Sequence, residues 1–138
     1  YVLVFSGEKL NGFFTGHNSY EKIQVDYYLD LSALKGTVSM TYNLQDNDNY
    51  DFVSIASDGT VKQGRISNGN TEVFEEGTTD VSKPLFVRVV SNDTHFRGYI
   101  DKKMVVHGHG DAPKAGSAGL KVEGSGTLIL QKMSLTKL

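Results

Sequence analysis

Two histidines and one aspartate stand at alternate positions in a glycine-rich segment, His107-Gly108-His109-Gly110-Asp111. An extended backbone points alternate side chains to the same side, so these three could reach one metal ion. Two imidazoles and a carboxylate suit zinc, copper or iron. The segment also fits a structural loop, or a loop whose His109 and Asp111 make polar contacts with a sugar. His17 and His95 are isolated in the sequence, and we interpret both as structural.

A second candidate is the run Asp46-Asn47-Asp48-Asn49-Tyr50-Asp51, in which five of six residues are Asp or Asn. Oxygen ligands at this density could hold Ca²⁺, which takes about 6–8 of them. The helix-loop-helix calcium pattern does not fit, because its sixth position is Asp51 and its twelfth is Ser57. Two alternatives remain: a loop that caps its own backbone through Asx turns, and direct hydrogen bonding to a glycan by Asp48, Asn49 and Tyr50.

A third candidate is one face of a hairpin that is predicted to turn at Asn92-Asp93. Its register places Arg88 opposite Arg97 and Phe86 opposite Tyr99, on the face away from the core. Two arginines directly opposed across strands repel each other unless an anion lies between them. This face therefore predicts a bound anionic group or a neutralising carboxylate nearby.

The chemistry of that face suits an acidic or fructan-like sugar. Arginine binds carboxylates and sulfates through two parallel hydrogen bonds. The aromatic rings of the hairpin, with Tyr28 from another strand, offer flat surfaces to the C–H faces of a sugar. The alternative is that Asp26 or Asp30 neutralises the arginines, which is an ordinary device on sheet faces.

The elements that position these groups are predicted to be strands. Ile23, Val25, Tyr27 and Leu29 alternate with polar residues, which is typical of a strand with one wet face. Similar segments recur every 8–12 residues or so with turn signals between them, as in an all-β sandwich or barrel. The expected strands after Leu29 are 36–43, 50–57, 60–67, 70–76, 84–91, 94–100, 103–107, 116–122 and 127–136. Leu31–Lys35 is the one segment with a helical pattern, at most a single turn.

Two turn signals, Asp58-Gly59 and Asn68-Gly69, predict a three-strand meander. Two-residue turns there set Arg65 opposite both Phe52 and Glu72, and Lys62 opposite Glu75. Glu72 and Glu75 would then point to opposite faces of their strand, each with a cation across from it. We interpret the acidic run 72–76 as surface ion pairing rather than a catalytic pair.

Composition excludes several classes of protein. The 138 residues carry 14 basic and 16 acidic side chains, a net charge of −2, which gives no reason to expect nucleic acid. No window approaches 18 apolar residues, so no membrane span is expected. The absence of cysteine removes disulfides and thiolate metal sites, and tryptophan is absent as well. The length predicts a single domain over residues 1–138, and the start at Tyr1 suggests a mature or excised segment of a longer chain.

From Leu10 to Leu138 the sequence resembles the concanavalin A-like, laminin-G-like β-sandwich superfamily. It is most similar to bacterial carbohydrate-binding modules of the levan-binding type and to 3-keto-disaccharide hydrolase-like domains. The resemblance rests on short segments in a fixed order: Leu10-Asn11-Gly12-Phe13, Asn49-Tyr50-Asp51-Phe52, Ser57-Asp58-Gly59-Thr60-Val61, Phe86-Val87-Arg88-Val89, Phe96-Arg97-Gly98-Tyr99-Ile100-Asp101, Ala115-Gly116-Ser117-Ala118-Gly119-Leu120 and the closing strand 128–135.

The resemblance implies a two-sheet antiparallel jelly roll that binds glycans on a concave sheet or in edge loops. Two positions depart from the pattern: Phe13 stands where relatives usually have Trp, and Asp101-Lys102 where they often have Asp-Gly. The Glu-x-Asp-x-x-Glu pattern of retaining hydrolases with this fold is absent.

We therefore expect a non-catalytic glycan-binding module of an extracellular or cell-surface protein, with neighbouring domains in a longer chain. No cofactor is expected beyond a structural Ca²⁺. The expected ligand-binding residues are Tyr28, Arg88, Arg97 and Tyr99 on the concave face, and Asp48, Asn49, Tyr50, His109 and Asp111 in edge loops. The alternatives are a hydrolase of the same fold, which needs two carboxylates within about 9 Å in a pocket, and a structural or adhesive domain, which needs an exposed apolar patch above about 600 Å².

Overall fold

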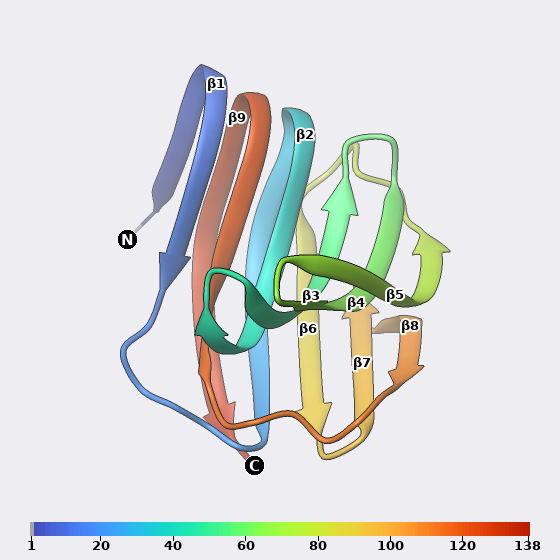
Figure 1. Cartoon of the computed structure of the whole chain (residues 1–138). Helices are drawn as coiled ribbons and strands as arrows, with labels where there is room; N and C mark the ends of the chain where they lie inside the picture. Colours follow the sequence, from blue (N-terminus) through green and yellow to red (C-terminus); the bar gives the residue numbers. More distant parts are fainter. Residues whose placement is uncertain (1) are drawn as a thin grey trace.

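The computed structural model describes residues 2–138 as an antiparallel β-structure, shown in Figure 1. The strands are β1 (Leu3–Thr15), β2 (Ile23–Asp46), β3 (Asn49–Ala56), β4 (Thr60–Ser67), β5 (Asn70–Thr78), β6 (Leu85–Asn92), β7 (His95–Ile100), β8 (Lys103–His109) and β9 (Ser117–Lys137). Among the described residues, no helix is long and apolar enough to span a membrane.

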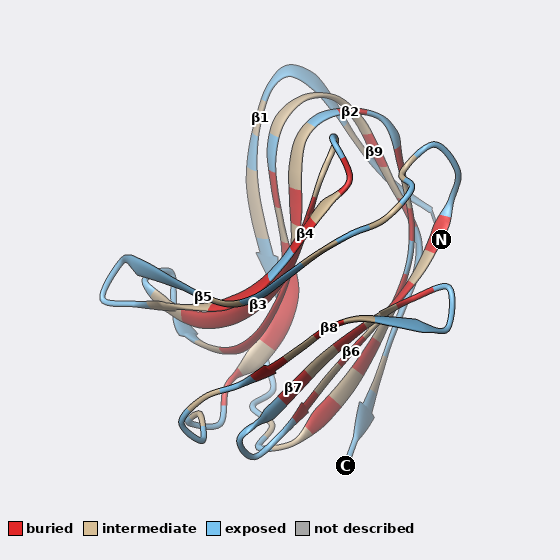
Figure 2. Cartoon of the chain, turned by 90° about the vertical axis from the view of Figure 1, so that its right-hand side faces the viewer, coloured by how far each residue is buried: buried red, intermediate tan, exposed pale blue. Residues whose placement is uncertain are grey.

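Three long strands, β1, β2 and β9, fold over and run through both layers of a sandwich. The first half of β2 pairs with β6 on one side and with the end of β9 on the other. The second half of β2 pairs with β3 and with the start of β9. One layer therefore continues through β6, β7 and β8, and the other through β3, β4 and β5, as Figure 2 shows from the side.

Glycines permit the long strands to bend together. Gly36 and Gly124 are directly paired and have φ of 155° and 126°. A Cβ on Gly36 would collide with the carbonyl oxygen of Glu123, and one on Gly124 with that of Lys35. The two backbones can approach this closely only without side chains. The predicted helical turn at Leu31–Lys35 is wrong, because this segment is part of β2: the pairing to β9 is interrupted at Leu31 and Ser32 and resumes from Ala33.

The core lies between the layers and follows the predicted alternation. Ile23, Val25, Tyr27 and Leu29 are all buried. The buried Tyr27 hydroxyl donates a 2.7 Å hydrogen bond to the carbonyl of Gly119, and burial raises the pKa of Tyr27 above its ordinary value. The second layer contributes Val38, Met40, Tyr42, Val53, Ile55, Val61, Leu120 and Val122. The two-sheet antiparallel sandwich expected from the sequence is confirmed.

Two of the three predicted hairpin registers differ from the structure. The β3–β4 connection contains three residues, Ser57–Gly59, so Arg65 pairs with Asp51 rather than Phe52. The β6–β7 turn is Asp93-Thr94, and the register moves by two residues. The turn at Asn68-Gly69 is confirmed, with positive φ at both residues.

Candidate functional site

A hollow of about 230 Å³ opens at one end of the sandwich, beside β3 and β4. Polar side chains surround it, together with the ring of Tyr50. Its lining residues are Asn43, Gln45, Asn49, Tyr50, Asp51, Arg65, Ile66, Ser67, Ala112, Pro113 and Lys114. Two of the expected ligand-binding residues, Asn49 and Tyr50, therefore lie here.

The centre of this hollow is an ion pair between Asp51 and Arg65. Arg65 donates from Nε to Oδ1 of Asp51 at 2.6 Å and from Nη2 to Oδ2 at 3.2 Å. Only 3% of the Asp51 side chain and 17% of the Arg65 side chain are exposed. Burial lowers the pKa of Arg65, but the hydrogen bond and charge of Asp51 outweigh it, and the pKa lies above its ordinary value. The arginine is thus held charged at the base of the hollow.

Neighbouring groups fix the orientation of the pair. Asn43 donates from Nδ2 to Oδ2 of Asp51 and to Oγ of Ser91, both at 2.9 Å. The Arg65 guanidinium lies 5.6 Å and 5.5 Å from the ring centroids of Phe74 and Phe96. Such cation–π contacts restrict the guanidinium plane as well as its position.

Some hydrogen-bonding capacity at the hollow is unused. Asn43 Oδ1 is buried and has no hydrogen-bond partner among the described residues. Arg65 uses Nε and Nη2 for Asp51 and for the main-chain carbonyl of Asp111. Within the described chain no acceptor is bonded to its Nη1, which carries two N–H donors. The two donors on Nη1 of Arg65 therefore remain for a ligand, whereas Asn43 Oδ1 is closed off from solvent.

The loop before β3 is held by its own side chains, as one alternative predicted. Oδ1 of Asp46 accepts hydrogen bonds from the Asp48 N–H at 2.8 Å and from Nδ2 of Asn49 at 2.9 Å. Oδ1 of Asn49 in turn accepts from the N–H of Asn68. These bonds lower the pKa of Asp46, with the Asn49 side chain as the largest cause. These bonds hold the start of β3, so that Asn49 and Tyr50 line the hollow. Asp48 does not line it.

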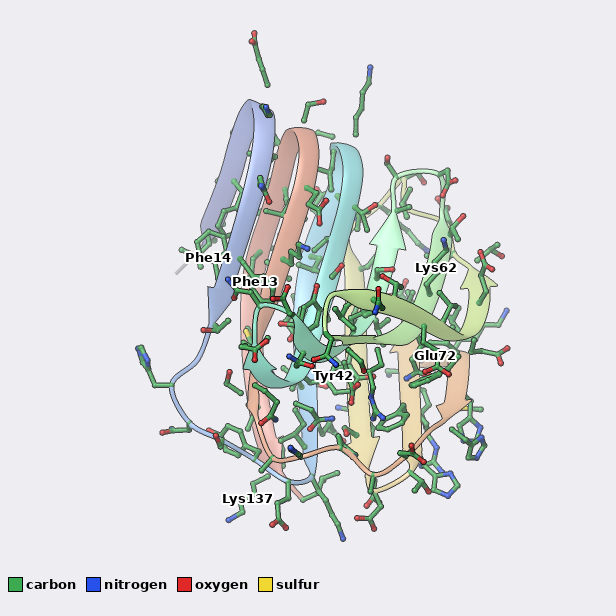
Figure 3. All side chains as sticks on the ribbon, viewed as in Figure 1. Phe13, Phe14, Tyr42, Lys62, Glu72 and Lys137 are labelled. Atoms are coloured by element: carbon green, nitrogen blue, oxygen red, sulfur yellow. The ribbon has the colours of Figure 1, made fainter. Side chains whose placement is uncertain are left out.

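Three aromatic side chains, Phe13, Tyr50 and Phe52, contact one another on the outer face of the same layer. Tyr50 makes an edge contact with Phe13, with ring centroids 5.2 Å apart. Phe13 is labelled in Figure 3. Tyr50 and Phe52 are only 7% exposed although they lie on this outer face. They border a second hollow of about 250 Å³ with Lys62 and Lys121. Phe13, at the position where the resemblance expects Trp, therefore packs on Tyr50.

The predicted arginine face on β6 and β7 exists with a corrected register. Arg88 is opposite Tyr99, and Arg97 is opposite Val90, so the arginines are not directly opposed. Asp26 accepts from Arg88 at 2.8 and 3.0 Å, and this hydrogen bond raises the pKa of Arg88. The neutralisation by Asp26 that the sequence offered as an alternative is therefore present for Arg88.

Arg97 is different, because no ion pair to it is found among residues 2–138. Arg97, Arg88 and Tyr99 line one shallow hollow of about 470 Å³. Tyr28 lies beside it, with its ring 4.8 Å from that of Phe86. The structure thus brings the four residues of the face together but separates them from Asn49 and Tyr50.

The histidine segment is arranged differently from the prediction. Asp111 is not part of the cluster that His107 and His109 form; its main-chain carbonyl accepts a hydrogen bond from Nη2 of Arg65. The third member of the cluster is His95, although it is isolated in the sequence. Burial, followed by His109, Arg97 and His95, lowers the pKa of His107. His109 is therefore part of a cluster of imidazoles at the end of β7 and β8.

Carboxylates are sparse in the hollows. Of five hollows on the described part of the chain, three are lined by one carboxylate side chain each, namely Asp51, Glu123 and Asp101. The other two are lined by none. Glu72 and Glu75 lie on β5, exposed, with Arg65 opposite Glu72 and Gln63 opposite Glu75. The predicted pairing of Lys62 with Glu75 is wrong, since an irregularity after Gln63 places Lys62 opposite Glu76. Figure 3 labels Lys62 and Glu72 on this part of the sheet.

The comparisons with known proteins identify the fold. No protein-family model matches the sequence, and no curated protein matches it. Among solved structures, the carbohydrate-binding module CBM66 from Bacillus subtilis has a TM-score of 0.80 at 19% identity, covering 92% of this chain and 82% of that one. A protein of unknown function with a galectin-like fold, also from Bacillus subtilis, gives 0.79 at 10% identity, over 99% and 81%. The galectin LEC-6 from Caenorhabditis elegans gives 0.70 at 12% identity, over 96% and 95%.

Proposed function

Because the chain has the concanavalin A-like β-sandwich fold shared with carbohydrate-binding modules and galectins, we propose that it is a non-catalytic glycan-binding module. Its primary site is the hollow at Asp51 and Arg65. The observation that carries the proposal is a largely buried ion pair that lines a small hollow and whose arginine has two unused N–H donors on Nη1. We propose further that the module belongs to an extracellular or cell-surface protein with other domains.

The size and chemistry of the hollow suit one sugar unit. Pockets for drug-sized ligands have volumes of about 300–1,000 Å³, so about 230 Å³ admits a smaller group. A sugar hydroxyl accepts hydrogen bonds, which matches the unused Nη1 donors of Arg65. Tyr50, which is 7% exposed, lines the hollow and supplies a small apolar edge for C–H groups. Lys114 at the rim adds positive charge, which favours an acidic sugar.

The arginine face on β6 and β7 is a second candidate surface for the same function. Its supporting observation is Arg97, which has no ion-pair partner in the described chain and lines a hollow with Tyr99. We rank this surface second because its ion pair is more exposed: the side chains of Arg88 and Asp26 are 39% and 15% exposed, against 17% and 3% for Arg65 and Asp51, so its polar groups are held less firmly. The scarcity of carboxylates in the hollows supports binding rather than two-acid hydrolysis.

The test is a glycan array of neutral and acidic polysaccharides, with and without chelated Ca²⁺, on three variants. Ser67→Tyr fills the hollow from its rim, where Ser67 is exposed. Ser6→Tyr adds the same ring to an exposed position of β1 that lines none of these hollows and serves as the control. Arg97→Ala probes the second surface.

We expect Ser67→Tyr to lose at least about tenfold in affinity, or about 1.4 kcal/mol, while Ser6→Tyr binds as the parent chain does. Loss in Arg97→Ala alone would move the site to the arginine face and contradict the placement at Asp51. The absence of any signal from the parent chain would contradict glycan binding itself. Glycan binding that is lost when Ca²⁺ is chelated would indicate that the loop at 46–51 holds the Ca²⁺ ion suggested by its sequence.

A further inference from the structure

Three of the four histidines of the chain converge on one face of β7 and β8. His95 and His109 are direct partners across the two strands, and His107 lies two residues from His109 on the same face. The ring centroids are 4.6 Å apart for His95 and His109, 4.8 Å for His107 and His109, and 6.0 Å for His95 and His107. One ring nitrogen from each lies within 4.8 Å of the other two.

The backbone that carries these rings is anchored to the core. The N–H of Gly108, between the two histidines of β8, donates a 2.7 Å hydrogen bond to Oε1 of the buried Gln63. A Cβ at Gly108 would lie only 2.7 Å from that oxygen, so the close contact requires glycine. The N–H of Gly110 also donates to the carbonyl of Thr94, beside His95. These two hydrogen bonds hold the backbone on both sides of His109 against the core and against the end of β7.

Nitrogen lone pairs in the cluster lack other partners. Nε2 of His107 is buried and forms no hydrogen bond within the described chain. An unpaired buried polar atom is unfavourable unless another group satisfies it. No carboxylate forms an ion pair with the cluster in residues 2–138. The charged neighbours of His107 on adjoining strands are Arg97 and Glu75, which act on the pKa of His107 in opposite directions.

We propose that His95, His107 and His109 bind one divalent transition-metal ion, with Zn²⁺ or Cu²⁺ as the fitting chemistry. Imidazole is a preferred ligand of both ions. Nitrogens at about 2.0–2.1 Å from tetrahedral zinc stand about 3.3 Å apart, so the observed spacing must contract modestly. His95 and His109 are exposed and can rotate toward His107. Three imidazoles leave a fourth position for water or a ligand atom.

The experiment titrates the untagged, chelator-treated chain with Zn²⁺ alone, followed by calorimetry and native mass spectrometry. Long-range ¹H–¹⁵N spectra of the imidazoles identify which rings respond. We expect one zinc per chain and shifts in three histidines, with the fourth, His17, unchanged. His107→Gln should weaken zinc binding by at least about tenfold, because two imidazoles remain. His17→Gln is the matched control and should bind as the parent chain does.

Zinc binding that is absent up to about 100 µM free ion, or unaltered in His107→Gln, would overturn the proposal. Equal losses in His17→Gln and His107→Gln would do so too, because they would indicate unspecific surface binding. If His107→Gln does not fold, His95→Gln replaces it, since this side chain is exposed. Ser67→Tyr should keep full zinc affinity, which separates this site from the glycan hollow.

Discussion

Arg65→Gln and Arg88→Gln remove the same kind of interaction from two places that differ in burial. Both arginines bind an aspartate through Nε and Nη2, Arg65 to Asp51 and Arg88 to Asp26. The Arg65 and Asp51 side chains are 17% and 3% exposed, whereas those of Arg88 and Asp26 are 39% and 15% exposed. Burial is thus the main variable, and Arg88→Gln is the control.

The expected loss of stability follows from what each substitution leaves behind. Arg65→Gln leaves the Asp51 carboxylate buried, with Asn43 as its remaining side-chain partner. Breaking a buried pair costs about 3–5 kcal/mol, and the opening to solvent places this pair near 3 kcal/mol. Arg88→Gln exposes a carboxylate that water can solvate, so less than about 1 kcal/mol is expected. At about 3–4 °C per kcal/mol for this chain length, Arg65→Gln should lower the Tm by roughly 10 °C.

Urea denaturation of both variants, with Asp51→Asn and the double variant Asp51→Asn/Arg65→Gln, measures these differences. We expect the double variant to be more stable than the sum of the single losses predicts, by about 2 kcal/mol, because it leaves no unpaired buried charge. Equal losses for Arg65→Gln and Arg88→Gln would refute the argument from burial. Additive losses within about 0.5 kcal/mol would refute the coupling of Asp51 to Arg65.

Two further predictions concern the frame of the sandwich. Gly124→Ala should destabilise the chain by at least about 2 kcal/mol in urea denaturation, because its φ is positive and a Cβ would collide with the opposite strand. Gly7→Ala is the control: a Cβ there meets only ordinary contacts, so the free energy of unfolding should change little. Asp46, Asp58 and Asp80 accept hydrogen bonds from residues two or three positions later, which hold their pKa below the ordinary value of 3.8. Their stabilising effect is present above about pH 4 and is lost as pH falls through the lowered pKa values; thermal melts should show this loss, and replacing the three by Asn should flatten it.

The sandwich could be predicted because its evidence is local and repeated. The alternation through Ile23–Leu29 and the positive-φ turn at Asn68-Gly69 each depend on a few adjacent residues. The bend in β2 could not be recognised in the same way. It arises where Gly36 meets Gly124, about ninety residues later. The segment Leu31–Lys35, just before Gly36, has a pattern that also fits a helical turn.

The ion pair at the hollow was missed because of one residue in a loop. A two-residue turn at Asp58-Gly59 would place Arg65 opposite Phe52, and the observed three-residue loop places it opposite Asp51. A shift of one residue also reverses which face a side chain occupies. One sequence signal could have indicated the pair: Asp51 directly precedes Phe52, Val53 and Ile55 in a predicted strand, where a carboxylate needs a partner.

The histidine cluster depends on a similar shift, and this links the two proposed sites. From the pair Ile100 and Lys103, regular antiparallel pairing would set His95 opposite Gly108. The irregularity between Gly98 and Tyr99 moves the partner by one residue, to His109. Regular alternation therefore builds the core, whereas a loop of three residues and a strand irregularity bring charged and metal-ligating side chains together. Chains with this sandwich can keep the core pattern and differ at these positions, so a common fold does not imply a common ligand.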